Sequence, residues 1–315
     1  MRVGGVRRRL PRRLPLVLAL VVVAAGLSVW AWRARAAEPF CWGAWEERDN
    51  GPWVVGGDID SRSVTETAPT PEDPHGSCVV TGEDEDRHYQ AELSYGPVPA
   101  EPDTLTSWIG VFLNGDAVPL PEGLPGTITR DGGMLLLPPE CDLDGRPTAV
   151  TLTGVGSGER YTNVWSKGQL LTEAARHGMA AAGCDAEPPS FTAPFTSLSP
   201  EQRHWNASPP VCGIQRLGPA EVGAYAWGGT RDDFQACGRN DAEFQLVMAG
   251  RPQLTEVFEP LLGTEALVAE ADCDGRRTVY YGRAAEEEFP VFIRAVAQRL
   301  GCEPPVSAAD EGGTA

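Results

Sequence analysis

The sequence ECDLDGR at residues 140–146 has a shorter counterpart, DCDGR, at residues 272–276. Each segment starts with an acidic residue and a cysteine and ends with Asp-Gly-Arg. In the first segment two further residues, Asp142 and Leu143, stand between these parts. Asp-Gly favours a tight hairpin turn because glycine accepts positive φ. We interpret the two segments as the same hairpin in two copies of one domain.

Further matches occur in the same order along the chain. Gly-Cys at 183–184 is followed by Asp-Ala-Glu-Pro-Pro, and Gly-Cys at 301–302 is followed by Glu-Pro-Pro. Arg176 and Arg294 each lie eight residues before the last cysteine of their copy. The shared order indicates a duplication.

The chain has 315 residues, which exceeds the usual size of one domain. The gaps between successive cysteines are 37, 63 and 43 residues in the first copy but 25, 36 and 29 in the second. We expect the excess in surface loops, where insertion costs little. The predicted segments are a cytoplasmic Arg-rich segment (1–13), a transmembrane helix (14–32), copy one (38–184), a Pro- and Ser-rich linker (185–210), copy two (211–304) and a disordered tail (305–315).

Hydrophobic periodicity predicts an α+β fold: in each copy a small antiparallel sheet, stapled by disulfides, packs against one C-terminal helix. The expected helices are Gln169–Ala182 and Glu286–Leu300, and in the second of these three glutamates would occupy the first turn. The expected strands are Tyr89–Leu93, Trp108–Leu113, Met134–Leu137 and Ala149–Leu152 in copy one, and Glu243–Met248, Glu265–Ala271 and Thr278–Tyr281 in copy two.

All eight cysteines follow the apolar N-terminal segment, and an even number in an oxidising compartment indicates disulfides. Zinc ligation or a redox pair would need closely spaced cysteines, but the chain has no C-x-x-C. Four cysteines allow three pairings within a copy. We favour first with second and third with fourth, which gives Cys41–Cys78, Cys141–Cys184, Cys212–Cys237 and Cys273–Cys302.

Leu14–Trp32 contains no charge and nearly matches the thickness of a bilayer at helical rise. Six arginines precede it and two follow, which predicts a single-pass cell-membrane protein with a cytoplasmic N-terminus and an extracytoplasmic C-terminus. Ala34-Arg35-Ala36 also fits a signal-peptidase site, so secretion after cleavage near Ala36 is the alternative. The length of the apolar run favours the uncleaved anchor.

Charge is distributed unevenly. Residues 1–37 hold eight of the 26 basic side chains and no acidic one, so the rest of the chain, with 44 acidic side chains, carries a net charge of about −26. A body so acidic repels phosphate backbones, which argues against a nucleic-acid partner.

The sequence contains no convincing catalytic, cofactor-binding or metal site, so we predict none. Residues 154–159 (GVGSGE) fit neither G-x-S-x-G nor G-x-G-x-x-G and are interpreted as a turn. Residues 142–145 (DLDG) lack the remaining ligands of a calcium loop, and a hairpin explains them. No histidine occupies the same place in both copies.

Three tryptophans, Trp42, Trp45 and Trp53, follow the first cysteine closely. Tryptophan presents a large, rigid surface that suits carbohydrate or protein ligands. We therefore name them as candidate binding residues. Core packing beside a disulfide is the alternative interpretation.

The Arg-rich N-terminus, the single lysine (Lys167) beside 25 arginines and the Ala/Gly/Pro bias resemble membrane-tethered actinobacterial proteins with tandem four-cysteine domains. The resemblance implies the layout and brings no catalytic motif. We expect a non-enzymatic envelope protein that contacts the membrane through its N-terminal helix and an envelope protein or cell-wall ligand through its two domains. An extracytoplasmic hydrolase with its site in the enlarged copy one is the competing hypothesis.

Overall fold

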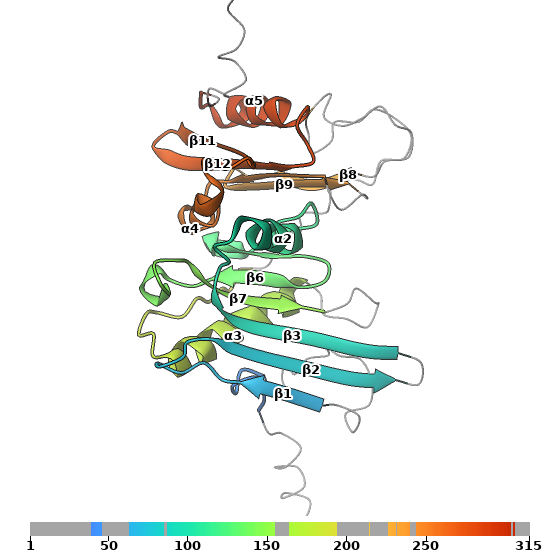
Figure 1. Ribbon diagram of the computed structural model, residues 1–315, viewed down its shortest axis with the longest axis vertical. Coiled ribbons are helices and arrows are strands. Elements are labelled where there is room, and N and C mark those ends of the chain that lie inside the picture. Colours follow the sequence, from blue (N-terminus) through green and yellow to red (C-terminus); the bar gives the residue numbers. More distant parts are fainter. Residues whose placement is uncertain are drawn as a thin grey trace, which may run out of the picture.

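The computed structural model describes residues 39–45, 63–84, 87–154, 164–193, 214, 226–230, 232–239, 244–303 and 305. These residues form a mixed α+β structure with two antiparallel sheets and disulfide bonds (Figure 1), which confirms the predicted fold class. The expected membrane segment, Leu14–Trp32, lies outside the described residues. Within them, no helix is both long and apolar enough to span a membrane.

Copy one forms a seven-stranded sheet in the order β1-β2-β3-β7-β6-β5-β4. Two helices belong to it: α2 follows β3, and α3 follows β7. The elements are β1 (Ser63–Thr67), β2 (Gly76–Asp84), β3 (Arg87–Pro97), α2 (Pro102–Phe112), β4 (Val118–Pro119), β5 (Gly126–Ile128), β6 (Gly133–Leu136), β7 (Thr148–Thr153) and α3 (Val164–Ala182).

Copy two forms a five-stranded sheet in the order β8-β9-β10-β12-β11. Its elements are β8 (Ala226–Thr230), β9 (Phe234–Arg239), β10 (Gln245–Ala249), α4 (Pro252–Glu256), β11 (Leu267–Cys273), β12 (Arg276–Arg283) and α5 (Phe289–Leu300). Without β4 and β5, copy one has the same strand order, with a helix at the same two points of the chain. The two copies therefore share one topology.

Hairpins and helix ends also match between the copies. Asp144-Gly145 and Asp274-Gly275 both adopt positive φ, between 54° and 78°, as the Asp-Gly turns predicted. Gly183 and Gly301, each with φ of 75°, end α3 and α5. Glycine is favoured there because a Cβ is strained in the left-handed conformation.

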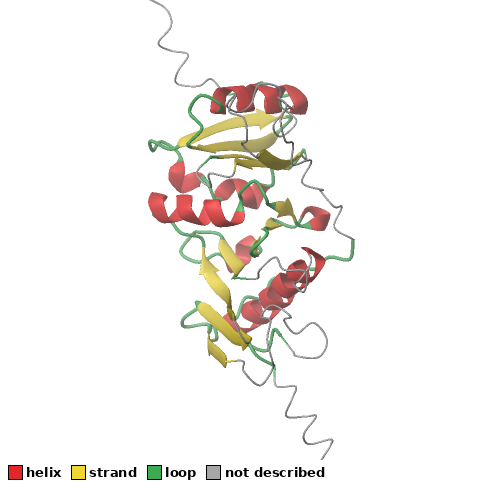
Figure 2. Cartoon of the chain, turned by 90° about the vertical axis from the view of Figure 1, so that its right-hand side faces the viewer, coloured by secondary structure: helices red, strands yellow, loops and turns green. Residues whose placement is uncertain are grey.

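Three apolar cores hold the described elements together: one between α3 and the first sheet, one shared by the two copies, and one between the second sheet and α5 (Figure 2). α3 covers the outer face of the first sheet, and α5 covers the outer face of the second. Between the sheets lie α2 and α4, in one core that both copies build. That shared core contains Leu105, Ile109, Phe112, Met134 and Leu136 from copy one and Phe234, Val247, Phe258 and Tyr281 from copy two. The two copies are thus joined by this core, which on the first sheet involves β6 and β7.

The prediction of a strand at Trp108–Leu113 was wrong, because these residues lie mainly in helix α2. Pro102 suits the first turn of a helix, where an amide hydrogen is not needed. Leu105, Ile109 and Phe112 then share one face and are buried in the shared core. A short apolar run such as WIGVFL fits a buried strand or a buried helix equally well.

Two further expectations need correction. The second C-terminal helix begins at Phe289, and the three glutamates at 286–288 form a turn before it. Pro290 occupies the first turn of the helix, which fixes where the helix starts.

The extra length of copy one was expected in surface loops, but part of it lies in regular structure. Helices α2 and α3 are longer than α4 and α5, and the strands β4 and β5 have no counterpart in copy two.

The structure contains the disulfides Cys41–Cys78, Cys141–Cys184 and Cys273–Cys302. Cys237 is disulfide-bonded as well, and its expected partner Cys212 lies outside the described residues. No cysteine in the described part of the chain is free. Cys141–Cys184 and Cys273–Cys302 each join the hairpin preceding the last strand to the end of the C-terminal helix.

Candidate functional site

The tryptophan loop, Phe40–Trp45, is the most strained segment of described backbone. Cys41, Trp42 and Gly43 have φ of 51°, 63° and 81°, three successive residues in the left-handed region. Only glycine adopts this conformation at little cost. The backbone of Phe40 and Trp45 closes the loop by two hydrogen bonds of 2.9 and 3.1 Å. Such a conformation persists only where the surroundings impose it.

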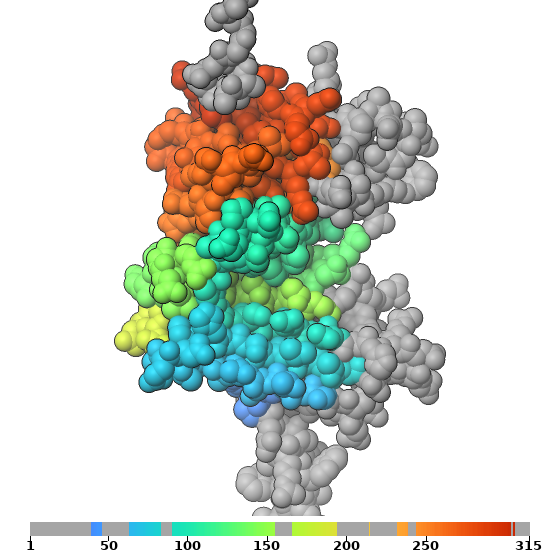
Figure 3. All heavy atoms as spheres, in the orientation of Figure 1, coloured from blue at the N-terminus to red at the C-terminus, as the bar shows by residue number. Residues whose placement is uncertain are grey.

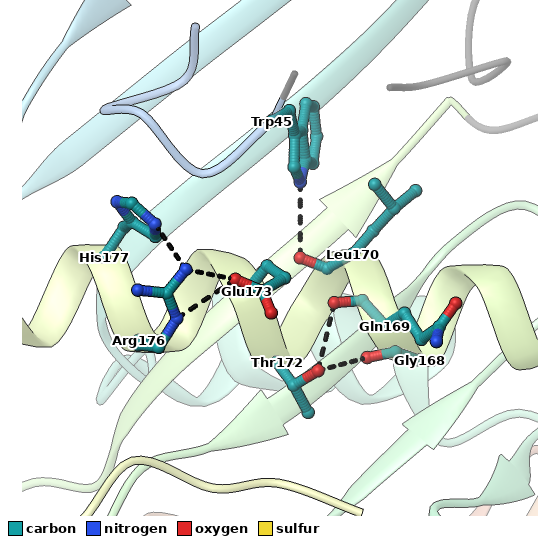
Figure 4. Close-up of polar contacts among 8 residues, drawn as sticks. All are labelled: Trp45, Gly168, Gln169, Leu170, Thr172, Glu173, Arg176 and His177. Atoms are coloured by element: carbon teal, nitrogen blue, oxygen red, sulfur yellow. Dashed lines mark hydrogen bonds and ion pairs between the residues drawn. The ribbon is translucent and has the colours of Figure 1, made fainter. Parts of the chain in front are cut away.

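Trp45 fastens the loop to helix α3. Its side chain is 2% exposed, and Nε1 donates to the carbonyl oxygen of Leu170 at 3.3 Å (Figure 4). The ring packs in the core between α3 and the first sheet. A ring buried in this way offers no surface for ligand stacking, so core packing is the correct interpretation for Trp45.

Trp42 lies nearer the surface and is partly buried. Its ring meets the ring of Tyr95 edge to face at 6.4 Å, and Nε1 donates to the carbonyl oxygen of Ser77 at 3.3 Å. Its backbone amide donates to Oε2 of Glu66 at 3.1 Å. Trp53 lies outside the described residues. Of the two candidate tryptophans that the structure describes, Trp45 is buried and Trp42 is partly buried, so these two do not form a joint binding surface.

Cys41, Glu66 and Cys78 place two sulfur atoms and a carboxylate oxygen within 4.8 Å of one another. The two sulfurs form a disulfide, and the Glu66 carboxylate accepts the Trp42 amide proton. Metal ligation by cysteine requires the thiolate. The group therefore fixes the tryptophan loop as long as the disulfide is intact.

A polar cluster lies on the surface of α3 beside the loop (Figure 4). Arg176 donates from Nε to Oε2 of Glu173 at 3.0 Å and contacts Nε2 of His177 through Nη2 at 2.7 Å. The Glu173–Arg176 pair is half-exposed and spaced i, i+3, which contributes little stability. A Cβ at Gly43 would lie 3.3 Å from Nδ1 of His177, so the loop packs closely on this cluster.

Lys167, the only lysine of the chain, is buried near the start of α3 with 4% exposure. Its Nζ donates to the carbonyl oxygens of Thr129, at 3.1 Å, and Arg130, in the turn between β5 and β6. Burial lowers the pKa of Lys167 to about 8, and the nearby Asp131 carboxylate opposes this shift. Lys167 ties the helix to the turn at the cost of a buried charge.

We predict that ¹³Cε-labelled lysine in the folded chain gives one resonance that titrates near pH 8. In the unfolded chain the pKa is close to 10.4. Between these values the unfolded state binds the additional proton, so the free energy of unfolding should rise with pH through the contribution of this group. In the variant Lys167→Met the free energy of unfolding, measured by urea denaturation, should therefore rise less between pH 7 and 9.5 than in the parent. Titration near the ordinary lysine value would contradict the prediction.

Acidic side chains of the two copies meet at the edge of the shared core. Burial raises the pKa of Asp142 in copy one, to which the charge of Glu140 adds. Burial also raises the pKa of Glu256 in copy two, with further contributions from Asp142 and Glu259. Carboxylates with raised pKa values are typical of acid–base sites, but ion-pair networks produce them too. Here Arg277 neutralises Glu259 at 2.7 Å and also pairs with Glu270.

Polar side chains of copy two donate hydrogen bonds to backbone carbonyl groups of copy one, where the two copies meet. Gln245 donates to the carbonyl oxygens of Ile109 and Leu113 at 3.2 and 2.9 Å. Arg251 donates from Nη1 to the carbonyl oxygens of Leu120, at 3.2 Å, and Leu124. Sequence reasoning missed these residues, because nothing in their local pattern shows which surface the second copy faces.

Glu122 holds the beginning of the predicted linker. Its Oε1 accepts the backbone amides of Thr192 and Ala193 at 3.2 and 2.8 Å and the hydroxyl of Thr192 at 3.0 Å. These donors lower the pKa of Glu122. The segment after Cys184 is therefore attached to copy one at Thr192 and Ala193.

Comparison of the chain with protein-family models, with curated proteins and with solved structures gives no match. The geometry of the described residues is thus the basis for the functional argument.

Proposed function

We propose that the chain is a non-enzymatic cell-envelope protein. A helix at Leu14–Trp32 anchors it in the membrane, and the two disulfide-stabilised domains present one rigid body outside for interaction with a protein or the cell wall. The observation that supports this most is the order of the elements along the long axis of the molecule. The strand nearest the expected anchor, β1, lies at one end of the molecule, and α5 lies at the other (Figure 1).

The chain between anchor and body is short. Eight residues lie between Trp32 and Cys41, and the nine steps from one Cα to the other span at most roughly 30 Å when extended. The Cys41–Cys78 disulfide and Trp45 attach the chain firmly from there on. Copy one would then lie next to the membrane, and copy two would face away from it. The strained tryptophan loop serves as the attachment point.

The test is to fractionate cells that produce the full chain. We expect the protein in the membrane fraction after alkaline extraction, with an intact N-terminal peptide in mass spectrometry, and digestion of the body by protease added to intact spheroplasts. A mature N-terminus at Ala37 in the medium would favour the secreted form. Recovery of a protease-protected chain from the cytoplasm would exclude the proposal.

A further inference from the structure

Among the described residues, one face of the first sheet is only partly covered. α3 packs on its outer face, while the shared core covers the inner face at β6 and the adjoining end of β7. The inner face of β1, β2 and β3 continues beyond that core. Figure 3 shows this region, in blue and cyan, as a broad surface. We call it the open face.

The pairing register places the side chains of the open face in rows across the strands. One row consists of Thr67, Ser77, Ser94 and Thr151. All four are exposed or partly buried. Neighbouring strands lie about 4.7–4.9 Å apart, so the hydroxyl groups form a regular line.

The next rows continue the pattern at about 6.8 Å along the strands, two residues away. Thr65, Val79, Glu92 and Thr153 form the second row. Ser63, Thr81 and Gln90 form the third. Eight of these eleven side chains carry a hydroxyl group and only Glu92 carries a charge, in a chain with 22% charged residues. In the described part of the chain, none of the eight hydroxyls bonds to another side chain.

The duplication provides an internal comparison. Aligning Cys78 with Cys237 makes Ser77 equivalent to Ala236, and the register then makes Ser94 equivalent to Val247. The three copy-two counterparts of Ser77, Ser94 and Thr151 are Ala236, Val247 and Tyr281, each at most 1% exposed in the shared core. Where the face is covered, these positions are apolar. Where it is open, they carry hydroxyl groups in place of the lysine–glutamate pairs that commonly keep a solvated sheet soluble.

We infer that the open face binds an uncharged, hydroxyl-rich polysaccharide chain. Serine and threonine hydroxyls both donate and accept hydrogen bonds, as sugar hydroxyls do. No cation is present in the three rows, and Glu92 together with the acidic body disfavours an anionic polymer. A sheet surface with hydrogen-bonding groups at regular intervals matches an extended polymer better than a small molecule. The inference rests on the proposed envelope function and specifies its cell-wall ligand.

The test is cosedimentation of the full chain, in mild detergent, with the insoluble uncharged polysaccharides chitin and cellulose. We expect binding by the parent protein. The variant Thr81→Val/Ser94→Ala/Thr151→Val should bind at least tenfold more weakly, because three hydrogen-bonding groups are lost. Val79→Glu, which places a second charge in the middle row, should also weaken binding. The control Thr104→Val/Ser107→Ala changes exposed residues of α2 and should leave binding unchanged.

Equal binding by the triple variant and the parent, with equal melting temperatures, would overturn the role of the open face and leave the envelope function standing. Absence of binding by the parent would overturn the polysaccharide as ligand. Cell fractionation decides the envelope location separately, so the two failures are distinguishable.

Discussion

Trp45→Ala is expected to lower the free energy of unfolding by about 3–5 kcal/mol, the range for truncating a large buried aromatic side chain. The ring fills the core between α3 and the first sheet, and the change also removes the hydrogen bond to Leu170. Trp42→Ala should cost less, about 1–2 kcal/mol, because the ring is partly exposed and its main contribution is the contact with Tyr95. Urea denaturation of both variants measures the difference.

Trp45→Phe separates packing from hydrogen bonding. Phenylalanine keeps most of the apolar volume but has no donor for Leu170, so this variant should fall between the parent and Trp45→Ala. Equal losses for Trp42→Ala and Trp45→Ala would contradict the assignment of Trp45 to the core.

The sequence was sufficient for those features that depend on short segments. Asp-Gly hairpins, the glycines that end α3 and α5, and the spacing of Phe292 and Val296 on one helix face require only local rules. The strands β6, β7, β10, β11 and β12 each contain an apolar segment long enough to be recognised. β1 (SVTET) was missed because it has a single apolar residue and both of its faces are exposed.

Features that depend on distant contacts could not be predicted. Trp42 and Trp45 are three residues apart and equally aromatic, and only the position of α3 and β3 decides which of them is buried. The shared core has the same cause: the apolar face of α2 requires a partner, but the sequence does not show that the second sheet provides it. The hydroxyl rows of the open face depend on register between strands that are distant in the chain.

Arg251 tests whether the two copies behave as one body. Its guanidinium is 5% exposed, pairs with Asp233 at 2.8 Å and binds two carbonyl groups of copy one. Breaking a buried ion pair by removing one partner typically costs 3–5 kcal/mol, and since Asp233 is partly exposed we expect about 3 kcal/mol for Arg251→Ala. Arg251→Lys keeps the charge but not the planar fork, and should recover only part of the loss.

Urea denaturation should show one transition for the parent, because the shared core makes unfolding of either copy expose apolar surface of the other. Arg251→Ala should shift that transition to lower urea. Arg294→Ala, an exposed change on α5, is the matched control and should stay within about 0.5 kcal/mol of the parent. Two separate transitions in the parent would mean that the copies unfold independently. The two copies would then not form the single rigid body on which the proposed function depends. A single cooperative transition that Arg251→Ala shifts to lower urea supports it.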